Sequence, residues 1–409
     1  MAGITGMGTT FGLFNYVGEL FAATPEDTPF LSAIGGLTGG EAVNSTLFQW
    51  QGYDLRDASA TRQRLEGAAA PTAEARARFN VTNVVEIHQE AVELSYTKLA
   101  ATGQYASTGS THTGAVGIDG TNPVVNELDW QIEQALKQIA RDVEKSFIVG
   151  SFNNPSDNNT PRRTRGILEA TQTNVHDAGT EVGTAAIEAD DETFTIVSHG
   201  LSNGDAVVVS DLTNGAVNVL NEGDLYYVVN ADTDTFQLAR KPNGPAIAFS
   251  ADGGATVYKA APLTETAVLD LMQDIWTSGG IQESETATLM VNATLKRGLT
   301  ELFITRKNYG EATRNVAGVN VQTIETDFGR VNLMLNRHMP TGVLSIVSLE
   351  ECAPVFLNIP GKGFLFVEEL ARVGASEKRQ MYGEIGLKYG NERKHGKLVG
   401  VAAPAPASS

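Results

Sequence analysis

The sequence predicts an α+β protein whose main body is interrupted by a small all-β domain. Helical and strand-like segments alternate on both sides of residues 173–258. That stretch itself contains only short β-rich runs separated by turn sequences. It also differs in composition, because it holds 13 acidic residues but only Arg240 and Lys241 as basic ones. We therefore expect a guest domain inserted into a larger body.

The net charge narrows the class of function. The 409 residues include 48 acidic and 30 basic side chains, which gives a formal net charge of −18. A protein that grips nucleic-acid phosphates needs a cationic surface, so this balance argues against that task. The inserted domain alone has a net charge of −11, and the other 323 residues carry the remaining −7. The acidity is mostly a property of one domain.

The cysteine count and the hydropathy exclude further classes of protein. The single cysteine, Cys352, leaves no internal disulfide framework and no multi-cysteine metal site. Nothing beside it in sequence stabilises a thiolate, which predicts a buried apolar cysteine. No Lys or Arg precedes Arg56, and no apolar run approaches the ~18 residues of a membrane span. We expect a protein that is made and used without export.

The N-terminal segment, residues 1–40, does not resemble the start of a folded domain. It holds nine glycines and few charges, yet it also carries several aromatic side chains. Such a Gly-rich segment does not fold alone, although its aromatic rings favour burial. One interpretation is a floppy terminus. The sharper one is an arm that becomes ordered against another surface, such as a neighbouring subunit.

Residues 45–97 predict two extended stretches around an irregular tip. The first covers residues 45–55, and the second covers residues 76–95, where apolar and polar side chains alternate with the period of a strand. The tip is poor core material because its residues are mainly charged side chains and alanines. A long two-stranded ribbon is only marginally stable by itself. This ribbon needs a partner to lie on.

The clearest helix is predicted over residues 127–148. Apolar side chains recur there at three- and four-residue spacing, and they form one face. That face consists of Leu128, Ile132, Ala135, Leu136, Ile139, Val143 and Phe147. Asn126 is a candidate N-cap and Gly150 a stop signal. A helix of this length measures about 33 Å, enough to be the spine of a flat domain.

The inserted domain and the region after it complete the element order. The β-rich runs of the insertion are residues 194–197, 206–210, 225–229 and 235–238, and they predict a small β-sandwich or barrel. Helices are expected over residues 263–278 and 294–303, around a strand at 287–291. The remaining chain mixes further strands, at residues 331–335, 342–347 and 363–366, with a helical or extended end.

The sequence contains no strong signature of a catalytic or ligand-binding site. The six histidines are scattered, and no nucleotide-binding, hydrolase or metalloprotease motif occurs. Glu86, His88 and Glu90 share one face of a strand, where they could converge on a cation, but a solvated polar strand face is the preferred interpretation. Asp232 and Asp234 indicate an acidic turn rather than a calcium loop. We predict no catalytic, cofactor-binding or metal-binding residue.

The basic run at residues 162–166 (RRTRG) is the strongest local charge feature. Phosphate binding is conceivable there. In so acidic a chain, we prefer a loop whose arginines pair with carboxylates of neighbouring segments or subunits.

Several stretches, in their order along the chain, carry a resemblance to a known family. They are residues 80–83 (NVTN), 140–144 (ARDVE), 162–166 (RRTRG), 327–331 (DFGRV), 336–340 (NRHMP), 369–374 (ELARVG) and 391–393 (NER). Together with the arm, the hairpin and the spine helix, they resemble tailed-bacteriophage major capsid proteins of the Hong Kong 97 type, in particular the SU-ten-type branch. The resemblance covers most of residues 20–400 outside the inserted domain.

The resemblance implies a mapping of the domains. Residues 1–40 correspond to an N-terminal arm and residues 45–90 to an extended E-loop that lies over an adjacent subunit. Residues 91–165, with part of 366–401, correspond to a peripheral domain. Residues 166–172 and 259–365 correspond to an axial domain. The insertion at 173–258 departs from the minimal pattern, and we expect it on the outer surface of a shell.

The function implied by the resemblance is structural. The chain would assemble through hexamers and pentamers into an icosahedral shell around double-stranded DNA, without sequence-specific DNA binding, catalysis, a cofactor or a membrane. Portal, scaffold and decoration proteins are further implied partners, and the location is the virion, with assembly in the bacterial cytoplasm. The expected contacts between subunits are Phe14, Tyr16, Phe21, Arg56, Arg62, Arg64, Arg76, Arg78, Arg162, Arg163 and Arg165.

Two alternatives stay open at this point. One is another phage structural or adhesin protein whose inserted domain binds a host glycan, which predicts that Tyr226, Tyr227 and Tyr258 cluster exposed on one face. The other is a hydrolase that uses a pair of carboxylates, since such pairs have no fixed spacing in sequence.

Overall fold

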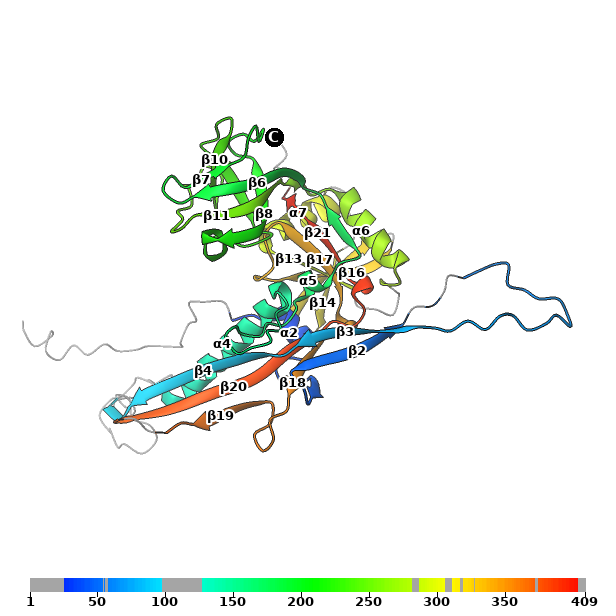
Figure 1. Cartoon of the computed structure of the whole chain (residues 1–409), viewed down its shortest axis with the longest axis horizontal. Coiled ribbons are helices and arrows are strands. Elements are labelled where there is room, and N and C mark those ends of the chain that lie inside the picture. The colour runs from blue at the N-terminus through cyan, green and yellow to red at the C-terminus, as the bar shows by residue number, and fades with distance from the viewer. Residues whose placement is uncertain are drawn as a thin grey trace, which may run out of the picture. The chain divides into compact units, whose positions relative to one another are not determined.

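Figure 1 shows the computed structural model with its helices and strands. The chain divides into two compact units. The structure describes residues 26–53, 55, 58–97, 127–281, 287–305, 311–316, 319–326, 328–371 and 374–403. Of the expected contact residues, Phe14, Tyr16, Phe21 and Arg56 lie outside this part of the chain. Of the described residues, the first unit contains those within 26–27, 88–142 and 359–383, and the second contains those within 28–87, 143–358 and 384–403.

The first unit is built on long strands. Strand β19 (Leu365–Glu369) pairs antiparallel with the beginning of β20 (Ser376–Lys388), and β4 (Glu86–Ser95) also pairs with β20. At the start of β20, the Ser376 hydroxyl donates a hydrogen bond of 2.7 Å to Glu93. This bond lowers the pKa of the Glu93 carboxyl, with a smaller contribution from the Lys378 ammonium.

Helix α4 (Glu127–Val149) is the longest helix in the described part of the chain. Glu127 and Asp129 lie in its first turn, where the helix dipole stabilises negative charge. The helix ends before Gly150, whose amide donates to the Ser146 carbonyl. A Cβ on Gly150 would come within 2.3 Å of that carbonyl oxygen, so the close turn after the helix requires glycine.

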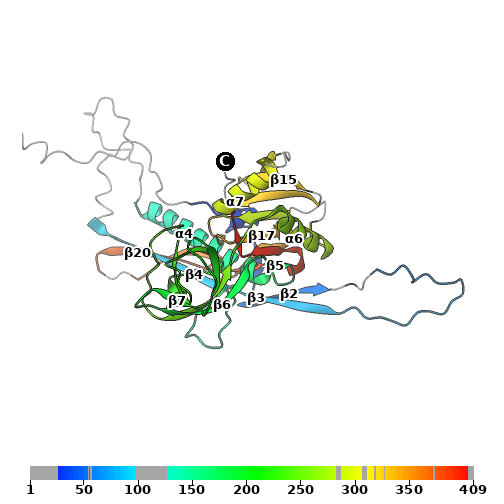
Figure 2. The same ribbon diagram turned by 90° about the horizontal axis from the view of Figure 1, so that it is seen from above.

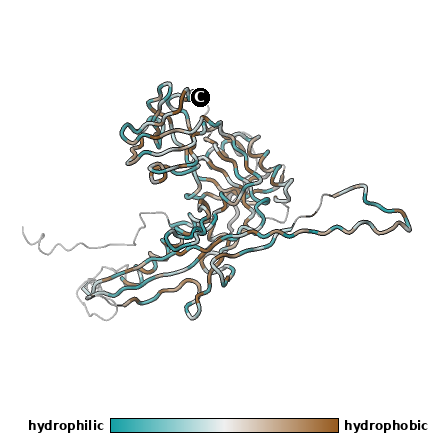
Figure 3. The backbone as a smooth tube through the Cα atoms, viewed as in Figure 1, coloured by the Kyte–Doolittle hydropathy of each residue, from teal (hydrophilic) through white to brown (hydrophobic). Residues whose placement is uncertain are grey.

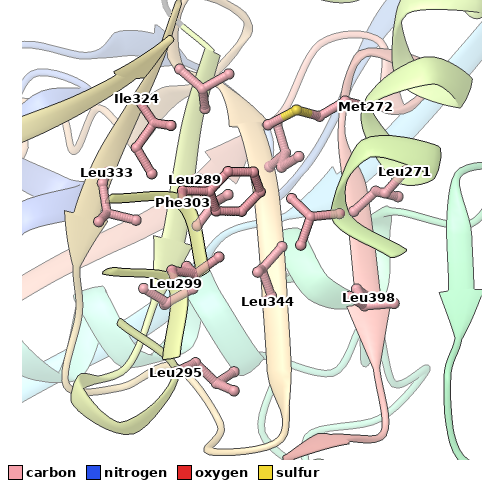
Figure 4. Close-up of a cluster of buried hydrophobic side chains, with 14 of the residues drawn as sticks. Leu271, Met272, Leu289, Leu295, Leu299, Phe303, Ile324, Leu333, Leu344 and Leu398 are labelled. Carbon is pink, nitrogen blue, oxygen red and sulfur yellow. The ribbon is translucent and has the colours of Figure 1, made fainter. Parts of the chain in front are cut away.

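The second unit contains a seven-stranded mixed sheet. Its order is β14 (Glu311–Val316), β15 (Val319–Thr326), β16 (Gly329–Leu335), β13 (Ala287–Val291), β17 (Val343–Ser348), β21 (Gly396–Val399) and β5 (Val175–Asp177). Helices α6 (Glu265–Thr277) and α7 (Ala293–Leu299) pack on it, followed by a π-helical turn, Thr300–Thr305. Figure 4 shows Leu271 and Met272 of α6 against Leu344 and Leu398 of the sheet in one buried cluster.

Shorter elements complete the second unit. They are α2 (Pro29–Ala33), β1 (Glu41–Val43), β2 (Leu47–Tyr53), β3 (Arg78–Val84), α5 (Ile167–Ala170), β12 (Ala261–Pro262), η4 (Leu349–Glu351), β18 (Ala353–Leu357), η5 (Glu392–Lys394) and β22 (Val401–Ala402). Strand β18 lies between β1 and the end of β20. Among the described residues, no helix has both the length and the apolar character that crossing a membrane requires.

The inserted domain is a closed six-stranded barrel, visible as the green strands in Figure 2. Its strands are β6 (Thr180–Glu188), β7 (Thr193–Thr195), β8 (Ala206–Asn214), β9 (Leu225–Val229), β10 (Thr235–Ala239) and β11 (Gly253–Lys259), with the short helix η2 (Gly215–Asn218) after β8. The Phe194 and Phe236 rings stack at 5.4 Å in its core. Residues 175–177, expected in this domain, instead pair with β21 in the large sheet.

The barrel is attached to the body at two places. At the first, β6 and β11 pair with Thr180 opposite Lys259, so the chain enters and leaves side by side. At the second, the Thr341 amide and hydroxyl donate to Asp224, and the Thr341 hydroxyl accepts from the Leu225 amide at 2.6 Å. Gly223 beside this contact has φ +78°, and a Cβ there would lie 2.9 Å from Val343. The barrel is held at two points rather than tethered at one.

The paired entry and exit predict that barrel and body fold independently. Paired residues of antiparallel strands lie about 5 Å apart, so a two-glycine link can replace residues 180–259 without straining the body. We expect the shortened chain and a fragment of residues 178–261 each to unfold cooperatively when heated, as measured by circular dichroism. A fragment without a cooperative transition would show that the barrel depends on its contact with Thr341.

Candidate functional site

Strands β2 and β3 form a two-stranded ribbon with one apolar face. In their register, Phe48 lies opposite Asn83, Trp50 opposite Val81, and Gly52 opposite Phe79. These pairs share a face, because side chains alternate along each strand. The Phe79 ring covers Gly52 so closely that a Cβ there would lie 2.4 Å from it. Glycine thus makes room for an aromatic ring that completes the apolar face.

Burial of this face falls along the ribbon. Phe48, near the base, is 6% exposed, whereas Phe79, near the outer end of the same face, is 45% exposed. Tyr53, at the end of β2 on the opposite face, is 68% exposed. Beyond the strands, Leu55 and Leu65 are 72% and 86% exposed. Figure 3 shows brown, hydrophobic positions continuing along the ribbon into its tip. The apolar side chains of the ribbon therefore continue beyond the part that the rest of the chain covers, and they are exposed there.

The base of the ribbon is firmly anchored. The Trp50 indole N–H donates to the Gly390 carbonyl at 2.7 Å, and its ring meets Tyr389 edge-on at 4.9 Å. Phe48 packs with Val85 and Val355 in a small buried cluster. These contacts fix the direction in which the ribbon leaves the body.

A single buried amide joins this base to two distant segments. Asn83 is fully buried, and its Nδ2 donates to the carbonyls of Leu387 at 2.7 Å and Arg165 at 3.2 Å. Its Oδ1 accepts from the amides of Arg165 at 2.8 Å and Val84 at 2.9 Å. All four hydrogen-bonding positions of the amide are used, so Asn83 ties the ribbon to the RRTRG loop and to β20.

Glu86 and Thr164 extend the same junction. The Glu86 carboxylate accepts the Thr164 amide at 3.0 Å, and the Thr164 hydroxyl accepts the Leu387 amide at 3.2 Å. Glu86, which the strand pattern grouped with His88 and Glu90, is thus a buried structural acceptor. Throughout the described ranges, no three His, Cys, Asp or Glu side chains are placed to hold a metal ion.

The arginines of the RRTRG loop have different environments. Arg162 forms an ion pair of 2.9 Å with Glu384, both largely buried. Arg165 donates to the Tyr389 hydroxyl at 3.2 Å and lies 4.6 Å from the centre of the Phe152 ring. Arg163 is exposed, and only its backbone is paired, with Asn153. The structure pairs two of the three with groups of their own chain.

The tip of the ribbon carries the other predicted arginines. Glu74 accepts hydrogen bonds from Arg62 and Arg76, and these two guanidinium groups lower the pKa of its carboxyl, Arg62 more than Arg76. Arg78 donates to Gln51 across the strands at 3.0 Å. Arg64 is exposed, with no side-chain partner in the described part of the chain. This tip thus presents surplus positive charge beside exposed leucines.

A buried carboxylate on α4 organises the body beneath the ribbon. Glu144 is fully buried and accepts the amides of Phe30 at 2.9 Å and Leu31 at 2.5 Å, at the start of α2. It also accepts the Asn336 side-chain amide. Sequence reasoning did not identify Glu144 or Asn83 as structural residues. The signal that marked both was their place inside stretches that resemble the capsid family.

The inserted barrel offers no aromatic platform of the expected kind. Tyr226 is 1% exposed and its hydroxyl accepts the Asn221 amide, while Tyr227 and Tyr258 are half-buried. Burial accordingly raises the pKa of the Tyr226 phenol. The glycan-binding alternative loses the observation on which it depended.

The acidic turn at Asp232 and Asp234 is structural. The Asp234 carboxylate accepts the Ser198 amide, which is typical of a structural turn.

Two buried groups near the ribbon base are also structural. Cys352 is buried, as predicted, and desolvation raises the pKa of its thiol. His395 is fully buried; its Nε2 donates to the Tyr389 carbonyl at 2.8 Å and its Nδ1 accepts the Ser348 amide at 3.2 Å. This arrangement holds a neutral ring, and desolvation lowers the pKa of His395.

Comparison with known proteins supplies independent information. The family model described as SU10 major capsid protein matches residues 3–402. A protein of Escherichia phage Phieco32, called major capsid protein, is 25% identical over 94% of this chain and 93% of its own length. The holo-SrpI encapsulin complex from Synechococcus elongatus PCC 7942 has a TM-score of 0.50 at 9% identity, over 100% of this chain and 99% of that one. A capsid chain of cyanophage A-1(L) has a TM-score of 0.49 at 11% identity, over 97% and 99%.

Removing the Asn83 amide should destabilise the whole base of the ribbon. Asn83→Ala leaves the Leu387 and Arg165 carbonyls and the Arg165 amide without their partner, which costs about 2–4 kcal/mol of unfolding free energy. The matched control is Asn80→Ala, an exposed asparagine of the same strand, which should change stability by less than ~0.5 kcal/mol. Denaturant titration of both variants measures this, and equal stabilities would contradict the assigned role.

Acid should weaken the fold through His395. Because the folded-state pKa is lowered, the unfolded chain takes up a proton below its ordinary pKa of about 6.5 while the folded chain does not. The stability is therefore full above that pH and falls as the pH drops below it. The charged neighbours Glu351, Glu392 and Lys394 do not reverse this direction. We expect unfolding free energies measured between neutral pH and about pH 5 to fall more steeply for the wild type than for His395→Gln; parallel profiles would exclude this contribution.

Proposed function

The chain belongs to the SU10 major capsid protein family, and on this premise we propose that it builds a phage shell by laying its β2–β3 ribbon across a neighbouring copy. The family makes it a capsid subunit of the virion with the Hong Kong 97-type fold. The observation that carries the proposal is the apolar face of the ribbon, which continues from buried Phe48 to exposed Phe79 and into the tip.

The ribbon has little other means of stability. A two-stranded hairpin without a third strand or a helix on its face is marginal in water. Burying a leucine side chain contributes about 1.5–3 kcal/mol, so Leu55 and Leu65 become favourable contacts only if another surface covers them. The surplus arginine charge at the tip suits a partner with a negative surface, and this chain is itself acidic.

The proposed contact between the ribbon and a neighbouring copy also accounts for a closed shell. A ribbon that lies on a different surface of the next copy makes a heterologous contact, and such contacts close into rings when the rotation allows it. We propose hexamers and pentamers of this kind, in an icosahedral shell around double-stranded DNA. Portal, scaffold and decoration proteins, and assembly in the host cytoplasm, belong to the proposal as well. We propose no catalytic role and no cofactor.

The structural boundaries refine the proposed domain roles. Residues 47–84 act as the E-loop, and β4, β19 and the first half of β20 act with most of α4 as the peripheral domain. The seven-stranded sheet acts as the axial domain. The barrel of residues 180–259 has 12 acidic and 3 basic side chains, a net charge of −9, and is proposed to face outward, so that this charge would describe the exterior of the shell.

Substitution of one tip leucine tests the proposal. Leu65→Ser should leave the subunit as stable as wild type, because the side chain is 86% exposed, yet it should weaken assembly by roughly tenfold in the subunit concentration required. Electron microscopy and light scattering measure shell formation, and thermal unfolding of the isolated subunit measures stability. The control is Val197→Ser, which removes a side chain that is 79% exposed on the barrel. Assembly of Leu65→Ser at the wild-type concentration would rule out a contact at this leucine.

A further inference from the structure

Strand β8 of the barrel ends in a backbone conformation that residues with a side chain rarely adopt. Asn214, its last residue, has φ 49° and ψ −124°. These are the angles of the first central position of a type II′ turn, which glycine normally occupies. An asparagine in this conformation is strained, and such strain persists only where the surrounding contacts hold it.

The contacts around Asn214 hold the conformation in place. The Gly215 amide donates to the Asp252 carbonyl at 3.0 Å, and the Asp252 carboxylate accepts the Ala189 amide at 3.0 Å. Gly215 is buried, and a Cβ on it would lie 2.0 Å from the Ala251 carbonyl oxygen. The residue after Asn214 is therefore required to be glycine, and the peptide between the two relaxes only if these contacts break.

The strained backbone brings two reactive groups together. For an L-residue, a ψ of about −120° eclipses the Cα–Cβ bond with the bond to the next peptide nitrogen. The Asn214 Cγ and the Gly215 nitrogen therefore lie on the same side, and rotation about the Cα–Cβ bond brings them together. That rotation is unrestrained, because the Asn214 side chain is exposed and has no hydrogen bond to any described residue. Such placement of reacting atoms accelerates an intramolecular reaction.

We propose that Asn214 is a site of spontaneous deamidation through a cyclic succinimide. The Gly215 amide loses its proton to water or hydroxide, and its nitrogen forms a bond to the Asn214 Cγ. The side-chain nitrogen of Asn214 takes up a proton and leaves as ammonia. Water then adds to either carbonyl of the ring, which opens to aspartate or isoaspartate. The reaction consumes one water molecule and needs no oxidant or cofactor.

The products change the end of the barrel where Asn214 of β8 pairs with Gly253 of β11. Aspartate adds one negative charge to a barrel that is already acidic. Isoaspartate also adds one methylene group to the backbone just before η2. This inference concerns the chemistry of the subunit itself and does not depend on the proposed shell.

The barrel contains two further Asn-Gly pairs, which serve as internal comparisons. In all three pairs the glycine amide donates to a backbone carbonyl, and this bond opens before the proton leaves. The bonds join Gly204 to Val228 at 2.8 Å, Gly215 to Asp252 at 3.0 Å, and Gly244 to Lys241 at 2.9 Å. Since the three pairs share this bond, it does not favour reaction at one of them.

The backbone conformation does distinguish Asn203 from Asn214. Asn203 is the first central residue of a turn closed by the Asp205 amide and the Ser202 carbonyl, with the following glycine at φ 92°. In such a type II turn ψ of that residue is about +120°, which places Cβ away from the next nitrogen. The Asn203 Oδ1 also accepts the Ala231 amide at 2.8 Å, which holds the side chain.

Asn243 has a positive φ as well, but it lies in a different turn. It follows Pro242 and has φ 55°, in a turn closed by the Gly244 amide and the Lys241 carbonyl. This is the second central position of a type II turn, where ψ is about 0°. Cβ and the next nitrogen are then not eclipsed. Of the three asparagines, Asn214 is the one arranged for ring closure.

Incubation of the full-length protein in mildly alkaline buffer, followed by peptide mass spectrometry over time, tests the site. In the folded protein, Asn214 should deamidate at least about tenfold faster than Asn203 and Asn243. In strong denaturant the three rates should lie within about threefold of one another, because each asparagine precedes glycine and the difference in backbone conformation is lost. Equal rates in the folded protein, or an unchanged ratio in denaturant, would overturn the proposal.

The products and one variant provide separate readouts. A mixture of aspartate and isoaspartate at position 214 identifies the ring, whereas aspartate alone would indicate direct hydrolysis and would overturn it. Asn214→Gly places glycine in a conformation that glycine prefers, so it should raise the midpoint of thermal unfolding by about 2 °C or more. Unchanged deamidation rates at Asn203 and Asn243 verify that this variant is folded. An equal or lower midpoint would contradict the strain at Asn214.

Discussion

The ribbon depends on one buried amide at its base. Asn83 connects three segments that are far apart in sequence, because its side chain bonds to Arg165 and Leu387 while its own strand pairs with β2. Trp50 and Phe48 add packing on one side of this junction. Everything beyond these contacts is a two-stranded ribbon without a core. The direction of the ribbon is therefore set at its base, and beyond that point the ribbon gains little stability from its own contacts.

Local patterns were sufficient wherever local interactions decide the structure. The spacing of apolar residues predicted a helix at 127–148, and the helix is Glu127–Val149. Turn sequences and short apolar runs predicted a β domain, because consecutive strands such as β6 and β7, or β9 and β10, pair with each other. The upstream boundary was less accurate because β5 (Val175–Asp177) pairs with β21, more than two hundred residues later. No local signal distinguishes a strand of the barrel from a strand of the large sheet.

The structural carboxylates and amides could not be recognised from sequence for a related reason. Glu144 lies in a polar stretch of α4 and resembles a solvated residue, yet its partners are the start of α2 and Asn336. A buried polar group is tolerated only when distant segments supply its hydrogen bonds, and sequence spacing does not show them. The expectation that arginines at 162–166 pair with carboxylates rested on overall charge, because an acidic chain supplies carboxylates in excess. Arg162 does form such an ion pair, with Glu384.

The ribbon tip exposes leucines beside arginines, whereas the barrel exposes mainly carboxylates. The ribbon tip exposes leucines, which gain free energy from any surface that excludes water, but apolar burial has no direction and does not fix register. The barrel exposes carboxylates, and the body beside it exposes Lys145 and Arg163. Exposed ion pairs add little free energy, yet they penalise misalignment because like charges then meet. Apolar contact at the ribbon tip therefore contributes free energy without fixing register, whereas exposed charge can fix register at little gain in free energy.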